Sequence, residues 1–304
     1  ARRQDKETGL ITAVFEETFI ANDVSGSMVY APVDTNIAVA HGCRNAANLV
    51  QKLGISGASE YFLNKENEIL DAVYNYLWDE EKGAYYPYVL PKKQRYYALM
   101  ASTFLGLEVK DPTGIRHKRL ISLLTDDDKF NWNLYPLTSV SKDDPLFTTV
   151  TGVYNGNPCW SGSVWSLIND AAIQALNAAG LKNLSAELSY KTVLTFAGNY
   201  CEFVHPFTRS GEGVQRYAWT ASHFIRIVIE ELFGVKYDGA AGKISLEPNL
   251  PDSLRKTFLV ILAALLFATA LPTFLAVFFE YRQSEEAAAS RMRHPFAAHP
   301  KHVV

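Results

Sequence analysis

Between residues 36 and 233, apolar residues at helical spacing recur in paired segments that short loops connect. In the first segment Ala40, Ala47 and Val50 fall on one face of a helix, and Gly54 ends the pattern. Helical pairs that repeat every ~40–50 residues are typical of a solenoid or of a closed ring of hairpins, and the period alone does not separate these two. The helices expected from the pattern lie at residues 40–54, 61–78, 93–107, 115–124, 165–180, 184–196 and 218–233.

Two short stretches depart from the helical pattern. In WDEEKGAYYPY, residues 79–83 form a turn, and the tyrosines that follow favour a short extended segment. In KYDGAAGKISLEPNLP, the turn at residues 239–242 predicts a β-hairpin. Helices account for most of the remaining pattern, so the predicted fold class is all-α.

Charge and cysteine usage exclude several kinds of partner. The formal net charge is −3, so no basic face is expected and nucleic acid is not a predicted partner. Cys43, Cys159 and Cys201 are scattered, and the chain has no CxxC or HExxH motif. We therefore expect no metal ion and no organic cofactor, and we interpret the cysteines as buried small apolar residues, with one disulfide left open.

A run without charge stands near the end of the chain. Residues 257–279, TFLVILAALLFATALPTFLAVFF, are long enough to cross a hydrocarbon core of ~30 Å. A buried core helix normally has a polar stripe, and this run has none, while Pro272 is tolerated as a kink within a bilayer. The expected organisation is a helical domain at residues 1–251, a linker at 252–256, a transmembrane helix at 257–279 and a polar tail at 280–304.

Basic residues around this run predict its orientation. More of them follow the run than precede it, which favours a cytoplasmic C-terminus. The large domain is then expected to be extracellular or lumenal, in a single-pass membrane protein. The acceptor sequon Asn183-Leu184-Ser185 is consistent with that side. The basic residues are Arg255 and Lys256 before the run, and Arg282, Arg291, Arg293 and Lys301 after it.

Two loops carry residues suited to carbohydrate chemistry. Glu202 lies in the connection GNYCEFVHPFTRSGEGVQRYAWTASHF, where Gly211 and Gly213 permit close backbone approach. A lone glutamate there is ordinarily a solvated surface residue, but a second loop, YNGNPCWSGSVWSLIND, brings tryptophans and amides to the neighbouring helix. Tryptophan faces stack on sugar rings, and amides bind hydroxyl groups. The candidate sugar-binding residues are Trp160, Trp165, Asn169, Tyr217 and Trp219.

A third loop, FEETFIANDVSGSMVYAPVDTN, precedes the first helix. Pro32 followed by Asp34 is typical of a helix start, with Asp34 in the first turn. The earlier acids Glu17 and Asp23 remain available for other roles, although each is by default a surface charge.

Three segments, in this order, resemble a known family. PVDTN resembles the PVDLN-type segment of trehalases, and GNPCWSGSVWSLIND is similar to a segment of glycoside hydrolase family 63. CEFVHPFTRSGEGVQRYAWTAS is similar to the E-x-x-NP-x-TG-x-G segment of the same enzymes, and EELFGV and ISLEPNLP follow it. The resemblance implies an (α/α)6 toroid of six helical hairpins, here without its N-terminal helices, and an inverting glycosidase that acts on α-glucosides or related small oligosaccharides.

The resemblance also implies catalytic roles. It places Glu202 at the general base, the group that activates water in an inverting glycosidase. The general acid precedes PVDTN in the family, where Asp23 and Glu17 are both candidates and neither is preferred. The family's arginine before the GPVW sequence is replaced here by Ser161-Gly162-Ser163.

Two other functions remain open from the residues. A toroidal sugar epimerase would use a pair of histidines for proton abstraction, which requires His41 and His205 to converge. A non-catalytic carbohydrate-binding or scaffold protein would keep the aromatic residues and lack a working acid. Replacing Glu202 separates these readings, because only a glycosidase depends on that carboxylate.

Overall fold

The computed structural model describes residues 3–13, 29–55, 57–133, 135–149, 160–239 and 241–255. The chain divides into a unit of residues Ala1–Leu250 and a unit of residues Pro251–Val304. Every helix and strand named below belongs to the first unit. Glu17, Asp23 and the predicted span and tail at residues 257–304 lie outside the described residues.

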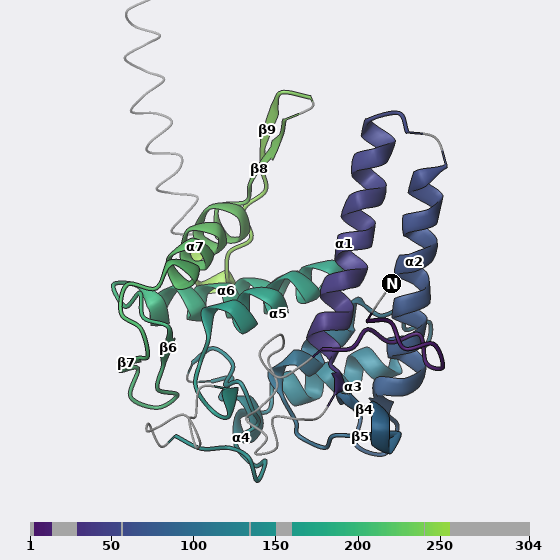
Figure 1. Ribbon diagram of the computed structural model, residues 1–304. Coiled ribbons are helices and arrows are strands. Elements are labelled where there is room, and N and C mark those ends of the chain that lie inside the picture. The colour runs from purple at the N-terminus through teal and green to yellow at the C-terminus, as the bar shows by residue number, and fades with distance from the viewer. Residues whose placement is uncertain are drawn as a thin grey trace, which may run out of the picture. The chain divides into compact units, whose positions relative to one another are not determined.

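The first helical pair agrees with the prediction. Helix α1 (Val33–Lys52) begins directly after Pro32, with Asp34 buried in its first turn. Helix α2 (Ala58–Ala72) continues into a π-helical turn, η2 (Val73–Leu77). Helices α1 and α2 pack side by side as an antiparallel pair (Figure 1).

The later helices also form where the periodicity predicts them. Helix α5 (Ser166–Ala178) and helix α6 (Lys182–Phe196) form the second long pair. Helix α7 (Ala218–Arg226) continues into the π-helical turn η6 (Ile227–Leu232). Helix α3 (Ile115–Leu124) lies within the predicted range, and a short helix, α4 (Asp127–Phe130), follows it.

The helix predicted at residues 93–107 is wrong. The chain there forms a short strand and then a 3-10 helix, η4 (Ala101–Glu108). Residues 101–107 are all buried, so the segment has no solvent face of the kind that an amphipathic α-helix presents. At Gly106 a Cβ atom would clash with the Tyr85 ring, so this close packing requires glycine. The apolar residues reflect burial on all sides rather than helical periodicity.

The strands are short and antiparallel. Strands β1 (Tyr30–Ala31), β4 (Tyr88–Val89) and β5 (Gln94–Arg95) form one sheet in the order β1-β4-β5. The turn and extended tyrosines predicted after residue 78 form the hairpin of β2 (Trp78–Asp79) and β3 (Ala84–Tyr85). The hairpin predicted around residues 239–242 is confirmed as β8 (Val235–Asp238) and β9 (Lys243–Leu246). A further hairpin joins β6 (Phe203–Val204) to β7 (Gly211–Glu212), and the short 3-10 turn η3 (Leu90–Lys92) lies between β4 and β5.

One row of helices forms the centre of the first unit. Helix α1 packs against η4, η4 against α5, and α5 against α7, while α2, α3 and α6 pack outside this row. The main core lies between these layers, where Phe104 meets Phe130 edge to face with ring centroids 4.9 Å apart. The arrangement is that of helical hairpins placed side by side, as the repeated pairs predict.

None of the helices in the described ranges combines the length and apolarity that a membrane crossing demands. Residues 257–279 lie outside the described ranges, so the membrane span at these residues stays a prediction. Of the cysteines, Cys201 is buried and Cys43 is half-buried, both as free thiols, and Cys159 lies outside the described residues.

A partly buried polar contact between α5 and α7 predicts that stability depends on pH. His223 Nδ1 lies 3.2 Å from the Ser166 hydroxyl. Burial lowers the pKa of His223 below its ordinary 6.5, an effect that the Asp170 carboxylate opposes and the Arg226 guanidinium reinforces. Below pH 6.5 the unfolded chain therefore binds more protons than the folded chain, so stability falls as the pH drops through the interval between the ordinary and the lowered value.

We expect His223→Asn, which keeps an amide near the Nδ1 position, to reduce this loss of stability on acidification. Urea unfolding of both proteins at pH 7.5, 6.5 and 5.5 measures it. Equal pH dependence in the two proteins would show that His223 does not carry the effect.

Candidate active site

Four extended segments run side by side ahead of the central helices. Antiparallel bridges join Met100 to Val140, Thr138 to Val164, and Val164 to Val204. Val164 is shared by the last two bridges, and its backbone exchanges both hydrogen bonds with Val204 at 3.0 Å. The two loops predicted to carry carbohydrate chemistry, one before α5 and one before α7, are thus in direct contact.

The segment that replaces the family's arginine is buried. Ser161 and Ser163 are 4% and 1% exposed. The Ser163 carbonyl accepts a hydrogen bond from the Ser139 N–H at 2.9 Å, and the Ser139 hydroxyl accepts one from the Gly162 N–H at 2.9 Å. These residues fix the loop against the neighbouring segment.

Asn169 holds the backbone rather than facing solvent. Its side chain is fully buried on α5. The amide nitrogen donates to the carbonyls of Leu137 and Trp165 at 3.1 and 2.8 Å, and the amide oxygen accepts from the Leu137 N–H at 2.8 Å. Its contacts therefore position the segment at residues 137–141. The predicted contact of Asn169 with sugar stays a prediction, and this geometry does not support it.

The predicted aromatic residues form two pairs. Trp165 is 3% exposed and stacks on Trp160, with ring centroids 4.0 Å apart and planes 11° apart. Its indole also lies against Phe203, at 5.1 Å between centroids. Tyr217 and Trp219 form the second pair at 5.7 Å, and Trp219 is 53% exposed. Trp165 is thus a core residue, while Trp160 and Trp219 are the more accessible indoles.

Glu202 is held at the base of the β6–β7 hairpin. Its N–H donates to the Val214 carbonyl at 2.8 Å, and its carboxylate Oε2 accepts from the Val214 N–H at 2.9 Å. Gly213 has φ +69°, and a Cβ atom there would lie 2.5 Å from Glu202 Oε2. The glycine that was noted in the sequence is therefore what allows the half-buried carboxylate to lie against the backbone.

The start of α7 is tied to the residues just before Glu202. The Tyr217 N–H donates to the Tyr200 carbonyl at 2.6 Å, and the Thr220 hydroxyl donates to the Cys201 carbonyl at 2.7 Å. The second aromatic pair is thereby anchored to the same loop as the carboxylate.

Glu212 is a carboxyl group near the site that the sequence analysis did not select. It pairs with Phe203 across the hairpin, and residues paired across strands project to the same face. Phe203 contacts Trp165, so Glu212 lies on the face of the hairpin that carries the first aromatic pair. Burial raises the pKa of Glu212, partly offset by the charge of His205. The signal in the sequence was Gly211-Glu212-Gly213, which was interpreted only through its glycines.

The two histidines of the epimerase reading have different surroundings. His205 Nδ1 accepts from the N–H groups of Phe207 and Thr208, both at 3.2 Å. His41 bonds Glu108 in a cavity of about 300 Å³ that α1, η4 and α5 line. Since each histidine is engaged with its own set of partners, this geometry gives the epimerase reading no support.

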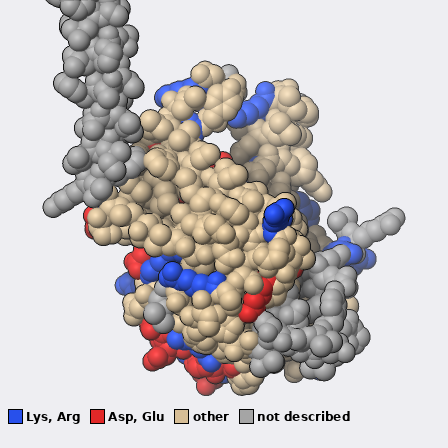
Figure 2. Space-filling model, turned by 90° about the vertical axis from the view of Figure 1, so that its left-hand side faces the viewer, with Lys and Arg blue, Asp and Glu red and all other residues tan. Residues whose placement is uncertain are grey.

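Charges of both signs lie on one face of the molecule. On the face shown in Figure 2, Lys and Arg lie interspersed with Asp and Glu, and the described residues there form no broad basic area. Within the described ranges, no three His, Cys, Asp or Glu residues come together as a metal site.

Comparison with known proteins identifies the family. Residues 2–220 match the family model described as the mannosylglycerate hydrolase MGH1-like glycoside hydrolase domain. The mannosylglycerate hydrolase of Rubrobacter radiotolerans is 24% identical over 193 residues, which are 62% of this chain and 41% of that protein. The chain therefore spans less than half the length of this curated relative.

Solved structures show the same fold. The GH63 mannosylglycerate hydrolase from Thermus thermophilus in complex with glucose has a TM-score of 0.55 at 22% identity, over 65% of this chain and 48% of that one. A sialidase structure has a TM-score of 0.66 at 15% identity, over 82% of this chain and 24% of that one. These similarities confirm the α/α toroid, and the family match confirms the resemblance stated from the three sequence segments. Because the family model covers well over half of the chain, the protein belongs to the mannosylglycerate hydrolase MGH1-like glycoside hydrolases.

Proposed function

We propose that the protein is an inverting glycoside hydrolase in which Glu202 is the general base. The observation that carries the proposal is the Val164–Val204 bridge, which sets the Glu202 loop against the tryptophan segment. The family membership supports hydrolysis of a glycosidic bond.

In this mechanism Glu202 accepts a proton from a water molecule as its oxygen attacks the anomeric carbon. The bond from that carbon to the leaving oxygen breaks, and a carboxylic acid on the opposite side of the sugar protonates the leaving oxygen. The hydrogen bond from the Val214 N–H fixes the orientation of the Glu202 carboxylate, as a base that must meet a positioned water requires. The two carboxyl groups of an inverting enzyme stand ~6.5–9.5 Å apart, which leaves room for the water.

The general acid is proposed to be Asp23 or Glu17, as the order of the segments implies. Both lie outside the described residues. An acid needs a raised pKa, and among the carboxyl groups near Glu202 this holds for Glu212. Parallel assays of Asp23→Asn, Glu17→Gln and Glu212→Gln identify the acid. The acid variant alone is expected to recover activity with a substrate whose leaving group needs no protonation.

The proposed substrates are α-glucosides and related small glycosides. The named relatives are mannosylglycerate hydrolases, so a glycosyl glycerate belongs in the test beside the glucosides. We expect the whole protein to hydrolyse at least one of trehalose, maltose, kojibiose, glucosylglycerate and mannosylglycerate. Proton NMR of the first product is expected to show the β-anomer from an α-linked substrate. With glucosylglycerate or mannosylglycerate, which release only one sugar, an α-anomer at early times would contradict inversion. No hydrolysis in the presence of sugar binding would favour the non-catalytic reading.

Residues 257–279 are proposed as a single membrane span, with the large domain extracellular or lumenal and the C-terminus cytoplasmic. The support is the uncharged run itself and the excess of basic residues behind it. Protease treatment of sealed vesicles measures the orientation, because only the domain on the outer side is cleaved. Extraction of the protein by alkaline carbonate would contradict the span.

A further inference from the structure

The β8–β9 hairpin has one apolar face. The register pairs Val235 with Leu246 and Tyr237 with Ile244. Paired residues project to the same side of a two-stranded sheet, and alternate residues along a strand do so as well. The four apolar side chains therefore share one face, which we call the hairpin face, and Lys236, Asp238, Lys243 and Ser245 share the other.

The hairpin face is open to solvent. Tyr237, Ile244 and Leu246 are 71%, 65% and 63% exposed. Figure 1 shows the hairpin extending away from the helices beside α7. An isolated two-stranded hairpin is marginally stable in water unless its apolar face is covered. An alternation this regular, left exposed, indicates a surface that is covered in the working protein.

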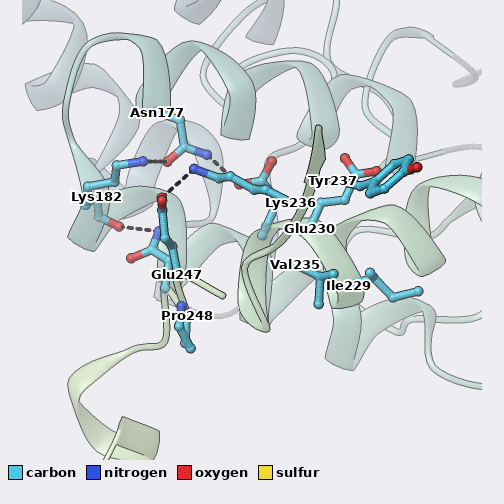
Figure 3. Close-up of a pocket in the computed structure, with 11 residues that line it drawn as sticks. Asn177, Lys182, Ile229, Glu230, Val235, Lys236, Tyr237, Glu247 and Pro248 are labelled. Atoms are coloured by element: carbon cyan, nitrogen blue, oxygen red, sulfur yellow. Dashed lines mark hydrogen bonds and ion pairs between the residues drawn. The ribbon is translucent and has the colours of Figure 1, made fainter. Parts of the chain in front are cut away.

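A large groove lies at the base of the hairpin. Its volume is about 980 Å³, and Ile229, Val235 and Tyr237 supply its apolar lining. In Figure 3, Val235 lies near Ile229 from η6, and Tyr237 lies beside Glu230. Lys236 pairs with Glu247 at 2.7 Å, and Lys182 donates to the Asn177 amide oxygen at 3.3 Å. The rim thus mixes both signs of charge, so a polyanionic or polycationic partner is not favoured.

The chain itself indicates what lies next to this face. Residues 247–249 are tied to the body, because the N–H groups of Glu247 and Asn249 donate to the carbonyls of Gly234 and Leu232. Only residues 250–256 then separate the body from the uncharged run that begins at Thr257. Seven residues reach at most about 25 Å, and a strand of four residues is about 13 Å long. If the run enters a bilayer, the hairpin face lies within reach of that bilayer's surface.

We infer that the hairpin face binds the interfacial region of the lipid bilayer next to the point where the chain enters it. The inference rests on the span proposed above. Apolar side chains enter the boundary between headgroups and acyl chains, and tyrosine is enriched at that depth. The large domain would thereby be held against the membrane by a second contact besides the span.

The test uses the full chain in phosphatidylcholine vesicles. The native cysteines are replaced, and one cysteine is introduced by Ile244→Cys or, as the matched control on the opposite face of the same strand, by Lys243→Cys. Each carries a nitrobenzoxadiazole label, and part of the lipid carries a doxyl quencher at a shallow acyl position. Both positions lie on the exposed hairpin, so the label is expected to leave the fold intact, as circular dichroism checks.

We expect the label at position 244 to shift to the blue and to lose fluorescence to the quencher, with little change for the label at 243. Equal quenching at both positions, or at neither, overturns the inference. Energy transfer between labels at 244 on different molecules, without lipid quenching, overturns it in favour of a second copy as the occupant. Flotation of the same sample separates the two proposals. If the chain floats with vesicles but its label is not quenched, the proposed span stands and the proposed hairpin contact is excluded. If the chain does not float, both proposals are excluded.

Discussion

Glu202→Gln is expected to lower the rate of glycoside hydrolysis by about 10²–10⁴-fold, the range over which positioned acid–base groups contribute. Glutamine keeps the shape of the side chain and can still accept the hydrogen bond from the Val214 N–H. It does not accept a proton from water at neutral pH, so the loss falls on the chemical step. We expect kcat to fall while the KM for the sugar changes little. The measurement is steady-state hydrolysis of whichever substrate of the panel the whole protein cleaves.

The matched control is Glu60→Gln, an exposed glutamate in the first turn of α2. It removes the same charge far along the chain from the Glu202 loop, and we expect activity within a factor of about two, as for surface substitutions generally. Azide supplies a sharper check in the Glu202→Gln variant, because this anion can itself attack the anomeric carbon and needs no base to remove a proton from it. Rescue by azide with formation of a glycosyl azide would support the role of Glu202. A Glu202→Gln protein of unchanged activity would exclude it as the base.

Arg226→Met is expected to destabilise the fold by about 3–5 kcal/mol, because it removes the cation of a buried ion cluster and leaves the carboxylates in place. Arg226 Nε donates to Asp170 at 2.9 Å, and Nη1 donates to Glu231 at 2.8 Å. The Asp170 and Glu231 side chains are only 6% and 13% exposed, so the substitution leaves both carboxylates without their cation. Burial alone lowers the pKa of the guanidinium, but the hydrogen bonds and charges of these two acids raise it above its usual value. Methionine keeps the apolar stem of the side chain, so the loss of stability reports the contribution of the guanidinium charge.

Urea unfolding of the full chain in detergent measures the change. The control is Lys93→Met, which removes an ion pair with Glu7 whose side chains are 66% and 68% exposed, and a change within about 1 kcal/mol is expected there. The double variant Arg226→Met with Asp170→Asn is expected to lose less stability than the sum of the two single variants, because it no longer buries that charge. Additive losses would argue against a coupled cluster. If Arg226→Met does not fold, Asp170→Asn alone still measures the contact.

The periodicity of the sequence predicted the long helices because one face of each helix is buried and the other is exposed to solvent. It failed at residues 93–107, where burial on all sides removes the contrast on which the pattern depends. Gly106 shows the cause, since it is selected by the ring of Tyr85, a contact that no local pattern contains.

The sequence predicted which loops carry the candidate site residues, but not how these loops pair with one another in space. Glu202 and the tryptophans were selected by residue type, yet the bridge between Val164 and Val204 that joins them is a long-range pairing. Asn169 was assigned to sugar because amides bind hydroxyls, and the structure uses it to hold Leu137. Glu212 was passed over because only the hairpin register shows which face it shares with Phe203. Residue type thus indicates chemistry, and tertiary pairing decides which residues are placed to perform it.

The shared pairing of Val164 has a practical meaning for altering the catalyst. A substitution that shifts the extended segment at Thr138 is expected to move its neighbour at Val164, and through it the backbone at Val204, two positions from the proposed base Glu202. Variants with new preferences are therefore worth seeking among residues that never touch sugar. If Glu202 is the base, remote positions in this small ladder offer fine adjustment of the carboxylate's position, whereas its direct replacement removes it.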